Sequence, residues 1–241
     1  MKLFDLDSPL MNILNKMADL MWLNILTLIC CIPIVTAGAS LTAMHYMALK
    51  IVRNEECYIT RGFFKSFKEN FKQATIIWFI LLLAAGVIAG DFYIITETGM
   101  ELNNVIKIII MAAAVLVLFT ATFVFPVLAK FENTIKRTLK NAFVMSILQF
   151  PKTILMVILG IVPWIAGAFF YQIIPIVFLF GFSVPAWVSA MLYNKFFQKL
   201  EDQILEANAP EVVADVTENE EDERIFKDEL DESISVGEDN K

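Results

Sequence analysis

A run of 42 residues, from Thr153 to Asn194, contains no Asp, Glu, Lys or Arg. As one α-helix this run would be about 63 Å long at roughly 1.5 Å per residue, which is about twice the hydrocarbon core of a bilayer. Apolar runs longer than about 18 residues are typical of membrane-spanning helices. We therefore interpret the run as two spans joined by a tight turn near Tyr171–Pro175, in the sequence YQIIP.

Three further apolar stretches are long enough to cross a bilayer once each. Residues 20–49 carry no formal charge, and their first part, LMWLNILTLICCIPIVTAG, predicts the first span. Residues 74–90 and 108–129 predict the second and third spans. Hydrophobic residues make up 58% of the chain, against roughly 45–50% in soluble domains. The sequence therefore predicts an all-α, polytopic membrane protein with about five transmembrane helices.

The positions of Lys and Arg predict the orientation of these spans, because bases accumulate in cytoplasmic segments. The connection DFYIITETGMELNNV, between spans two and three, has three acids and no base, so we expect it outside. This pattern predicts a multi-pass protein of the plasma membrane, with its amino terminus outside and its carboxyl terminus in the cytoplasm. The bases of the two segments expected in the cytoplasm are Lys50, Arg53, Arg61, Lys65, Lys68 and Lys72, then Lys130, Lys136, Arg137, Lys140 and Lys152.

The acidic residues are concentrated at the carboxyl end. Residues 201–241 hold 16 of the 26 acids and three bases, a net charge of −13, which leaves +6 for residues 1–200. Large apolar residues are too few after residue 206 to form a core. We therefore divide the chain into a helical transmembrane domain, residues 1–200, and an acidic, disordered cytoplasmic tail, residues 201–241.

One polar motif occurs twice between the spans. FFKSFKENFKQA (residues 63–74) matches FENTIKRTLKNA (residues 131–142) after a shift of 68 residues, with the shared pattern F-x-x-[ST]-[FI]-K-x-x-[FL]-K-[QN]-A. At about 100° per residue, each copy predicts a cytoplasmic amphipathic helix that leads directly into a span, with an apolar face and a face of lysines. The residues predicted to dock a partner or lipid are Phe63, Phe67, Lys68, Phe71, Lys72, Phe131, Ile135, Lys136, Leu139 and Lys140.

Two questions about this motif stay open at the level of sequence. The copies are explained either by an internal duplication or by convergence on what any interfacial helix needs. Their lysines fit either anionic lipid, where each base contributes about 1 kcal/mol, or a soluble partner that docks on these helices together with residues 38–60.

The stretch IPIVTAGASLTAMHYMALKIVRNEECYITRGFFKSFKENFKQA (residues 32–74) resembles the signature region of the YesL family of bacterial membrane proteins, whose biochemical function is unassigned. LAKFENTIKRTLKNAF, residues 128–143, resembles the second recurrent block of that family. The resemblance spans roughly residues 1–200. It implies a Gram-positive bacterial origin and a genomic setting often shared with carbohydrate ABC transporters.

The sequence offers little chemistry for catalysis. It has one histidine, His45, and none of the motifs H-E-x-x-H, G-x-S-x-G or G-x-x-x-x-G-K-[ST]. Cys30, Cys31 and Cys57 form no metal-binding spacing. We therefore expect no enzyme activity, no metal, no cofactor and no nucleic-acid partner. The polar residues within the spans that could meet a solute are Asn24, Thr27, Thr120, Thr122, Gln172 and Ser183.

These observations, with the implied genomic setting, lead to one preferred hypothesis and two alternatives. The first is a non-enzymatic accessory protein of a carbohydrate ABC transporter, with membrane lipid and transporter subunits as partners. The alternatives are a stand-alone permease or channel for a small solute, and a lipid-facing scaffold.

Overall fold

The computed structural model describes residues 9–55, 58–97 and 103–206. Contacts group the chain into two units, Met1–Asn194 and Lys195–Lys241. Within the described ranges every regular element is a helix, which confirms the predicted all-α class. The predicted tail lies outside these ranges from residue 207 onward. The elements are α1 (Pro9–Cys31), η1 (Ile34–Thr36), α2 (Ala37–Val52), α3 (Ile59–Glu97), α4 (Asn104–Lys130), α5 (Ile135–Leu148), α6 (Phe150–Phe169), η2 (Tyr171–Ile173), α7 (Ile174–Phe180) and a last helix, Ser183–Glu206.

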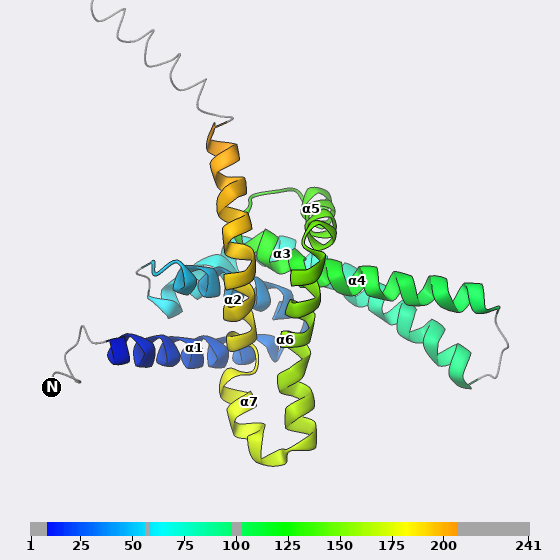
Figure 1. Cartoon of the computed structure of the whole chain (residues 1–241), viewed down its shortest axis with the longest axis horizontal. Helices are drawn as coiled ribbons and strands as arrows, with labels where there is room; N and C mark the ends of the chain where they lie inside the picture. Colours follow the sequence, from blue (N-terminus) through cyan, green and yellow to red (C-terminus); the bar gives the residue numbers. More distant parts are fainter. Residues whose placement is uncertain (1–8, 56–57, 98–102, 207–241) are drawn as a thin grey trace, which may run out of the picture. The chain divides into compact units, whose positions relative to one another are not determined.

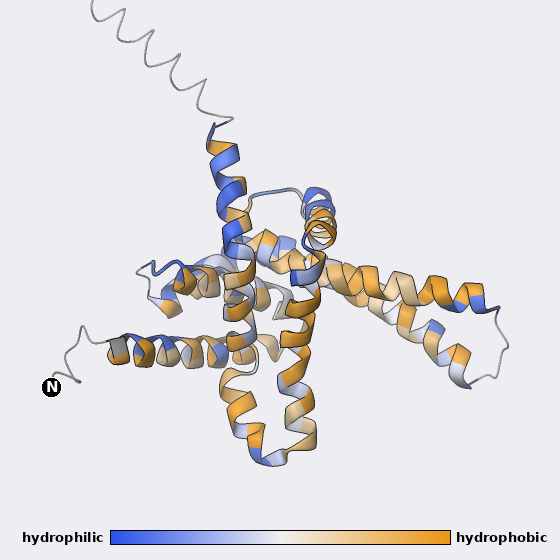
Figure 2. Cartoon of the chain, in the orientation of Figure 1, coloured by the Kyte–Doolittle hydropathy of each residue, from blue (hydrophilic) through white to orange (hydrophobic). Residues whose placement is uncertain are grey.

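Four helices, α1, α3, α4 and α6, are long and apolar enough to cross a membrane, and the bent pair Tyr171–Phe180 and Ser183–Glu206 raises the number to five. The prediction of about five spans is confirmed. Figure 2 shows the second half of α3, most of α4, and α6 as predominantly hydrophobic. Many of their large apolar side chains are exposed, for example Leu83 at 73% and Ile108 at 67%. Such surfaces are stable against lipid rather than water.

Helix α2 forms the centre of the packing, which the sequence did not indicate. It contacts α1, α3 and α4, and eleven of its 16 residues are buried. Small residues allow this close approach. A Cβ atom at Gly38 would lie 2.6 Å from the carbonyl oxygen of Ala74 and 2.7 Å from Cβ of Trp78. The expected docking surface over residues 38–60 is therefore not formed by its first part, because most of α2 is enclosed by other helices.

Helix α3 is continuous over 39 residues and joins the first motif copy to the second span. This agrees with the prediction for that copy. Its polar first part contacts α2, and its apolar second part pairs with α4, as Figure 1 shows. At about 1.5 Å per residue the helix is about 58 Å long, which exceeds the bilayer core.

The second copy behaves differently from the prediction. Its helix, α5, ends at Leu148 and does not continue into the span, α6. Gln149 separates them with φ −109° and ψ 37°, which is not helical. The physical reason is Pro151, which has no N–H to donate to the carbonyl of Ile147 and whose ring disfavours a continuous helix at this point. The two motif copies thus share a sequence pattern but differ in how they connect to the membrane.

The turn predicted near Tyr171–Pro175 is confirmed, because α6 ends at Phe169 and α7 begins at Ile174 after the short η2 helix. The fifth span, however, is broken. Its two parts are bent by 55° at Gly181 and Phe182. Pro185 explains the break, since it lacks the N–H that would bond the carbonyl of Gly181 in a continuous helix.

Asn24 of α1 bonds the backbone groups around this break. Its Nδ2 donates to the carbonyl oxygen of Phe178 at 2.7 Å. Its Oδ1 accepts the backbone N–H groups of Phe182 and Ser183, both at 2.9 Å. The Asn24 side chain is fully buried. The side-chain amide of Asn24, on a different helix, therefore supplies hydrogen-bond partners to backbone groups on both sides of the break.

Candidate functional site

The first motif copy places its two faces in different environments. Phe63 and Ala74 are buried, and the Phe63 and Phe67 rings stack with centroids 6.2 Å apart. Phe71 lies next to Phe67 with a centroid separation of 5.6 Å, and both are half-buried. Lys68 and Lys72 are exposed. Four bases recur at the spacing of one helix face, namely Arg61, Lys65, Lys68 and Lys72.

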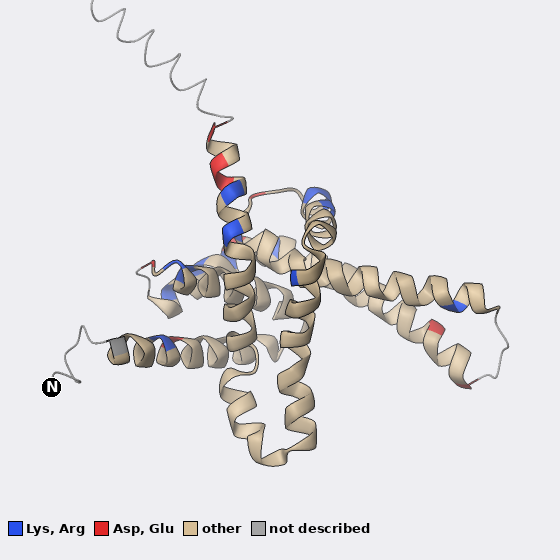
Figure 3. Ribbon diagram, in the orientation of Figure 1, with Lys and Arg blue, Asp and Glu red and all other residues tan. Residues whose placement is uncertain are grey.

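The second copy begins before α5. Phe131 is the residue that caps the carboxyl end of α4 and is half-buried, so it is not part of the second amphipathic helix. On α5, Ile135 and Leu139 are half-buried, while Lys136 and Lys140 are exposed. Thr138 and Ala142 are buried. Figure 3 shows the bases of α5 gathered on the helix surface, whereas α6 beyond its first turn and α7 carry no charge.

The two copies meet in space. Gln73, in the first copy, donates from Nε2 to the carbonyl oxygen of Asn133 and to Thr138 Oγ1, the latter at 3.4 Å. Beside this contact lies a groove of about 810 Å³, which we call the inter-copy groove. Its charged lining consists of Lys65, Glu69, Lys130, Glu132 and Arg137.

The inter-copy groove contains only one of the ten predicted docking residues, Phe131. The four lysines of the predicted set do not line the groove. They are exposed on α3 (Lys68 and Lys72) and on α5 (Lys136 and Lys140). Sequence reasoning missed the groove because it forms between residues that are about 60 positions apart. The repeated motif was the signal that could have indicated it.

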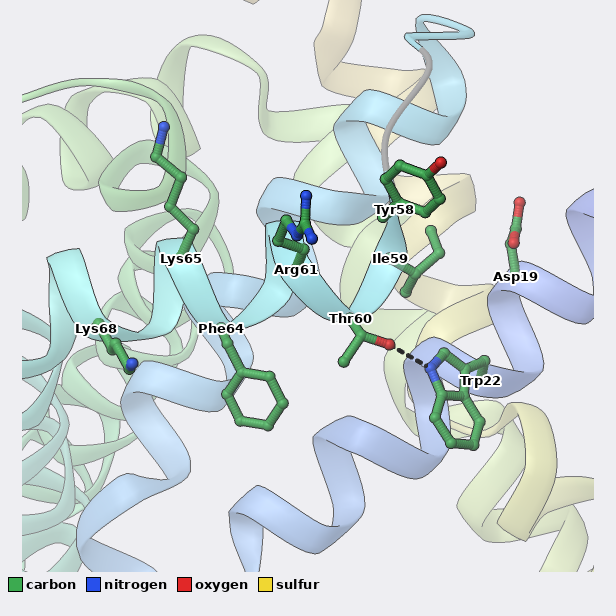
Figure 4. A pocket seen from close by; sticks show the side chains of 9 residues that line it. All are labelled: Asp19, Trp22, Tyr58, Ile59, Thr60, Arg61, Phe64, Lys65 and Lys68. Carbon is green, nitrogen blue, oxygen red and sulfur yellow. Dashed lines mark hydrogen bonds between the residues drawn. The ribbon is translucent and has the colours of Figure 1, made fainter.

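A second hollow lies between α1 and the start of α3, which we call the α1–α3 pocket (Figure 4). Its volume is about 810 Å³. Trp22 of α1 donates from Nε1 to Thr60 Oγ1 at 2.9 Å, and this bond ties the two helices together. The remaining lining residues are Asp19, Tyr58, Ile59, Arg61, Phe64, Lys65 and Lys68.

The charges of the α1–α3 pocket are unbalanced. Arg61, Lys65 and Lys68 contribute three positive charges against the single carboxylate of Asp19. The Arg61 guanidinium lies 5.8 Å from the centre of the Tyr58 ring, a cation–π distance. Figure 4 shows Asp19 near Tyr58 and Trp22, and Lys65 and Lys68 at the other end of the pocket.

The polar residues predicted within the spans bond mostly to their own helices. The hydroxyls of Thr27, Thr120 and Thr122 donate to the carbonyl four residues earlier, at 2.8, 2.8 and 2.9 Å. Gln172 is exposed in the turn before α7. The Ser183 hydroxyl is buried and has no hydrogen-bond partner among the described residues. The three threonine hydroxyls thus bond the backbone of their own helices rather than a shared solute site.

His45 lies on α2 and lines a smaller cavity of about 300 Å³. Its Nδ1 is buried without a hydrogen-bond partner in the described part of the chain. Burial lowers the pKa of His45 to about 4, so the ring is neutral at physiological pH. Within the same described ranges, no group of three or more His, Cys, Asp or Glu side chains could hold a metal ion.

A family model described as "Protein of unknown function, DUF624" matches residues 20–92. The match begins within α1, includes all of α2 and ends near the end of α3, so it contains the first motif copy and every residue that lines the α1–α3 pocket except Asp19. No curated protein and no solved structure matches the chain. Over its first three helices, this multi-pass membrane protein is thus similar to a family whose function is unassigned.

Proposed function

We propose that the protein is a non-enzymatic accessory subunit that docks a carbohydrate ABC transporter through the surface of its two motif copies. The observation that carries the proposal is the contact between the copies, in which Gln73 bonds Asn133 and Thr138. This contact combines two short amphipathic segments into one polar region. A surface of that kind offers a soluble partner more area than either helix alone.

The charges of this surface favour an acidic partner. Lys68, Lys72, Lys136 and Lys140 are exposed, and no ion pair with a described residue neutralises them. Exposed bases steer an acidic partner and set the orientation in which it docks. The positive-inside pattern supports a cytoplasmic position for both copies, where the ATPase subunits of such transporters reside. The carbohydrate transporter itself rests on the resemblance of residues 32–74 and 128–143 to the YesL family.

The test is affinity purification of the full chain from native membranes in mild detergent, followed by mass spectrometry. We expect a transporter subunit to copurify with the wild type and to be lost when Lys68, Lys72, Lys136 and Lys140 are all changed to Glu. The matched control changes the same four residues to Arg, which keeps the charge, and should retain the partner. Membrane insertion and monodisperse elution are checked for both variants.

A wild-type chain that purifies without any transporter subunit would contradict the proposal. Loss of the partner in the Arg variant as well as the Glu variant would show that charge is not the basis of docking. Retention in the Glu variant would place the docking surface elsewhere.

One structural observation favours the stand-alone permease as a second candidate. The broken fifth span resembles the discontinuous helices that line solute sites in secondary transporters. Against it, the backbone groups at the break are already bonded by Asn24 and are not free to bind a solute. Solute flux into liposomes that contain only this protein would support the permease, and its absence would leave the accessory role as the better proposal.

A further inference from the structure

We infer that the α1–α3 pocket is a binding site for a glycerophosphate group, such as the headgroup of an anionic phospholipid. The pocket holds three positive charges and one negative charge within about 810 Å³. Arg61, Lys65 and Lys68 form no ion pair with any residue that the structure describes. An anion in this pocket would therefore meet donors that are not already occupied.

The spacing of the three bases brings them to one side of α3. Positions 61, 65 and 68 follow the i, i+4, i+7 pattern, so they share one side of the helix, and Figure 4 shows the Lys65 side chain extending upward from α3 and the Lys68 ammonium at its lower edge. A planar guanidinium binds two phosphate oxygens in parallel, and lysine ammonium groups add point charges. Arg61 is held over the Tyr58 ring, which restricts its guanidinium before a ligand arrives. A phosphate carries more negative charge and more acceptor oxygens than a carboxylate, so it can use more of these donors.

The aromatic residues of the pocket favour a ligand at the membrane interface. Tryptophan and tyrosine are enriched where a bilayer meets water, with the apolar ring in the lipid and the polar atom at the headgroups. The Trp22 indole is fixed by its hydrogen bond to Thr60. Phe64 also lines the pocket, and Figure 4 shows its ring on the opposite side of α3 from the Lys65 ammonium. The pocket thus combines phosphate-binding cations with apolar surface, which matches a headgroup and the start of its acyl chains.

The continuity of α3 also indicates how the bases of the α1–α3 pocket lie relative to the bilayer. The helix starts at Ile59 with its bases and becomes apolar after Gln73, without a break. Lys68 lies five residues before Gln73, about 8 Å along the helix, and Arg61 lies twelve residues before it, about 18 Å. Lys68 is therefore the base of the pocket closest to the lipid phosphates. The single acid, Asp19, belongs to α1 and lies at the end of the pocket farthest from Lys68. It reduces the net charge to +2 and leaves the Lys65 and Lys68 end positive.

The experiment measures retained lipid by native mass spectrometry of the full chain, released from nanodiscs of phosphatidylcholine mixed with phosphatidylglycerol. The test variant changes Arg61, Lys65 and Lys68 to Gln. The matched control changes Lys72, Lys136 and Lys140 to Gln, which removes the same charge outside the pocket. We expect the test variant to lose affinity for phosphatidylglycerol by on the order of 100-fold, about fivefold for each base. The control should lose less than about threefold.

Soluble glycerol 3-phosphate is added as a competitor to separate two sources of the same chemistry. Bound phosphatidylglycerol that glycerol 3-phosphate does not displace supports a lipid site. Displacement by the soluble compound supports a site for a free phosphate ester. Equal losses in the test and control variants, or equal retention of phosphatidylcholine and phosphatidylglycerol by the wild type, would overturn the proposal.

A conservative variant separates binding from folding. Arg61→Lys keeps the positive charge but removes the bidentate guanidinium donor, so we expect a loss of about twofold, smaller than that for Arg61→Gln, with unchanged elution and helicity. Lys68 belongs to both proposals, whereas Arg61 is not among the residues predicted to dock a partner, so the Arg61→Lys result is independent of the transporter proposal. Phosphatidylglycerol retention with no copurified transporter would refute the docking role alone.

Discussion

Replacement of Asn24 tests how much its hydrogen bonds to the broken fifth span contribute to the stability of the fold. We expect Asn24→Leu to destabilise the fold, because Leu has a similar size but can neither donate to Phe178 nor accept from Phe182 and Ser183. The substitution leaves three backbone groups unsatisfied in the interior of the helical bundle. It does not create a large cavity, so the effect reports chiefly on hydrogen bonding.

The magnitude follows from the three bonds. Hydrogen bonds between membrane helices contribute about 0.6–1.7 kcal/mol each, and comparable values apply in soluble proteins. Loss of all three gives about 2–5 kcal/mol. For a chain of this size, each kcal/mol lowers the midpoint of thermal unfolding by about 2–4 °C, so a fall of about 10 °C is expected.

The assay is thermal unfolding in detergent, followed by far-ultraviolet circular dichroism. The matched control is Thr122→Val, because the Thr122 hydroxyl donates only to Leu118 of its own helix and its loss should cost under about 1 kcal/mol. Amide hydrogen exchange should also accelerate at Phe182 and Ser183 in the Asn24 variant, since those N–H groups lose their acceptor. If both variants unfold within about 3 °C of the wild type, Asn24 does not stabilise the break, and the reasoning is wrong.

Three further predictions concern packing, pH and orientation. Gly38→Ala should cost about 1–3 kcal/mol, seen as a lower unfolding temperature, because its methyl group would collide with Ala74; Gly86→Ala, where nothing lies within 4 Å, is the control. His45 has a folded pKa of about 4, below its unfolded value, so its contribution is complete above about pH 6.5 and stability falls by about 3 kcal/mol as the pH drops towards 4. His45→Gln should remove most of that slope in denaturation measured across this range. A membrane-impermeant thiol reagent on intact cells should label Glu97→Cys and not Glu132→Cys; the reverse pattern would refute the predicted orientation.

Much of the fold was predictable because membrane insertion depends on local composition. The charge-free run from Thr153 to Asn194 required two spans, and its turn appears where Pro175 follows YQII. The apolar face of the first motif copy was also predictable, since helical periodicity decides which side chains share a face, whereas Phe131 of the second copy lies before α5 and not on it. Phe63 and Ala74 are buried as that periodicity requires.

The remainder depends on contacts between distant residues. Asn24 was recognisable as a polar residue in a span, but its three bonds reach residues more than 150 positions away. Helix α2 resembles the end of a first span in composition, and only its packing against three helices shows that it is a core element. The α1–α3 pocket requires Trp22 to meet Thr60, a pairing that no periodicity indicates.

The uninterrupted length of α3 gives the two motif copies unequal mechanical properties. A continuous helix of 39 residues behaves as a stiff rod, so a force applied at Lys68 or Lys72 is delivered to the membrane-embedded half of the same rod. Helix α5 instead ends at Leu148, and its link to α6 is a non-helical residue, Gln149, bridged by the hydrogen bond from Thr153 Oγ1 of α6 to the carbonyl oxygen of Ser146 of α5 at 2.8 Å. A partner bound to both copies would therefore contact one helix that continues into the membrane, α3, and one that ends before its span, α5.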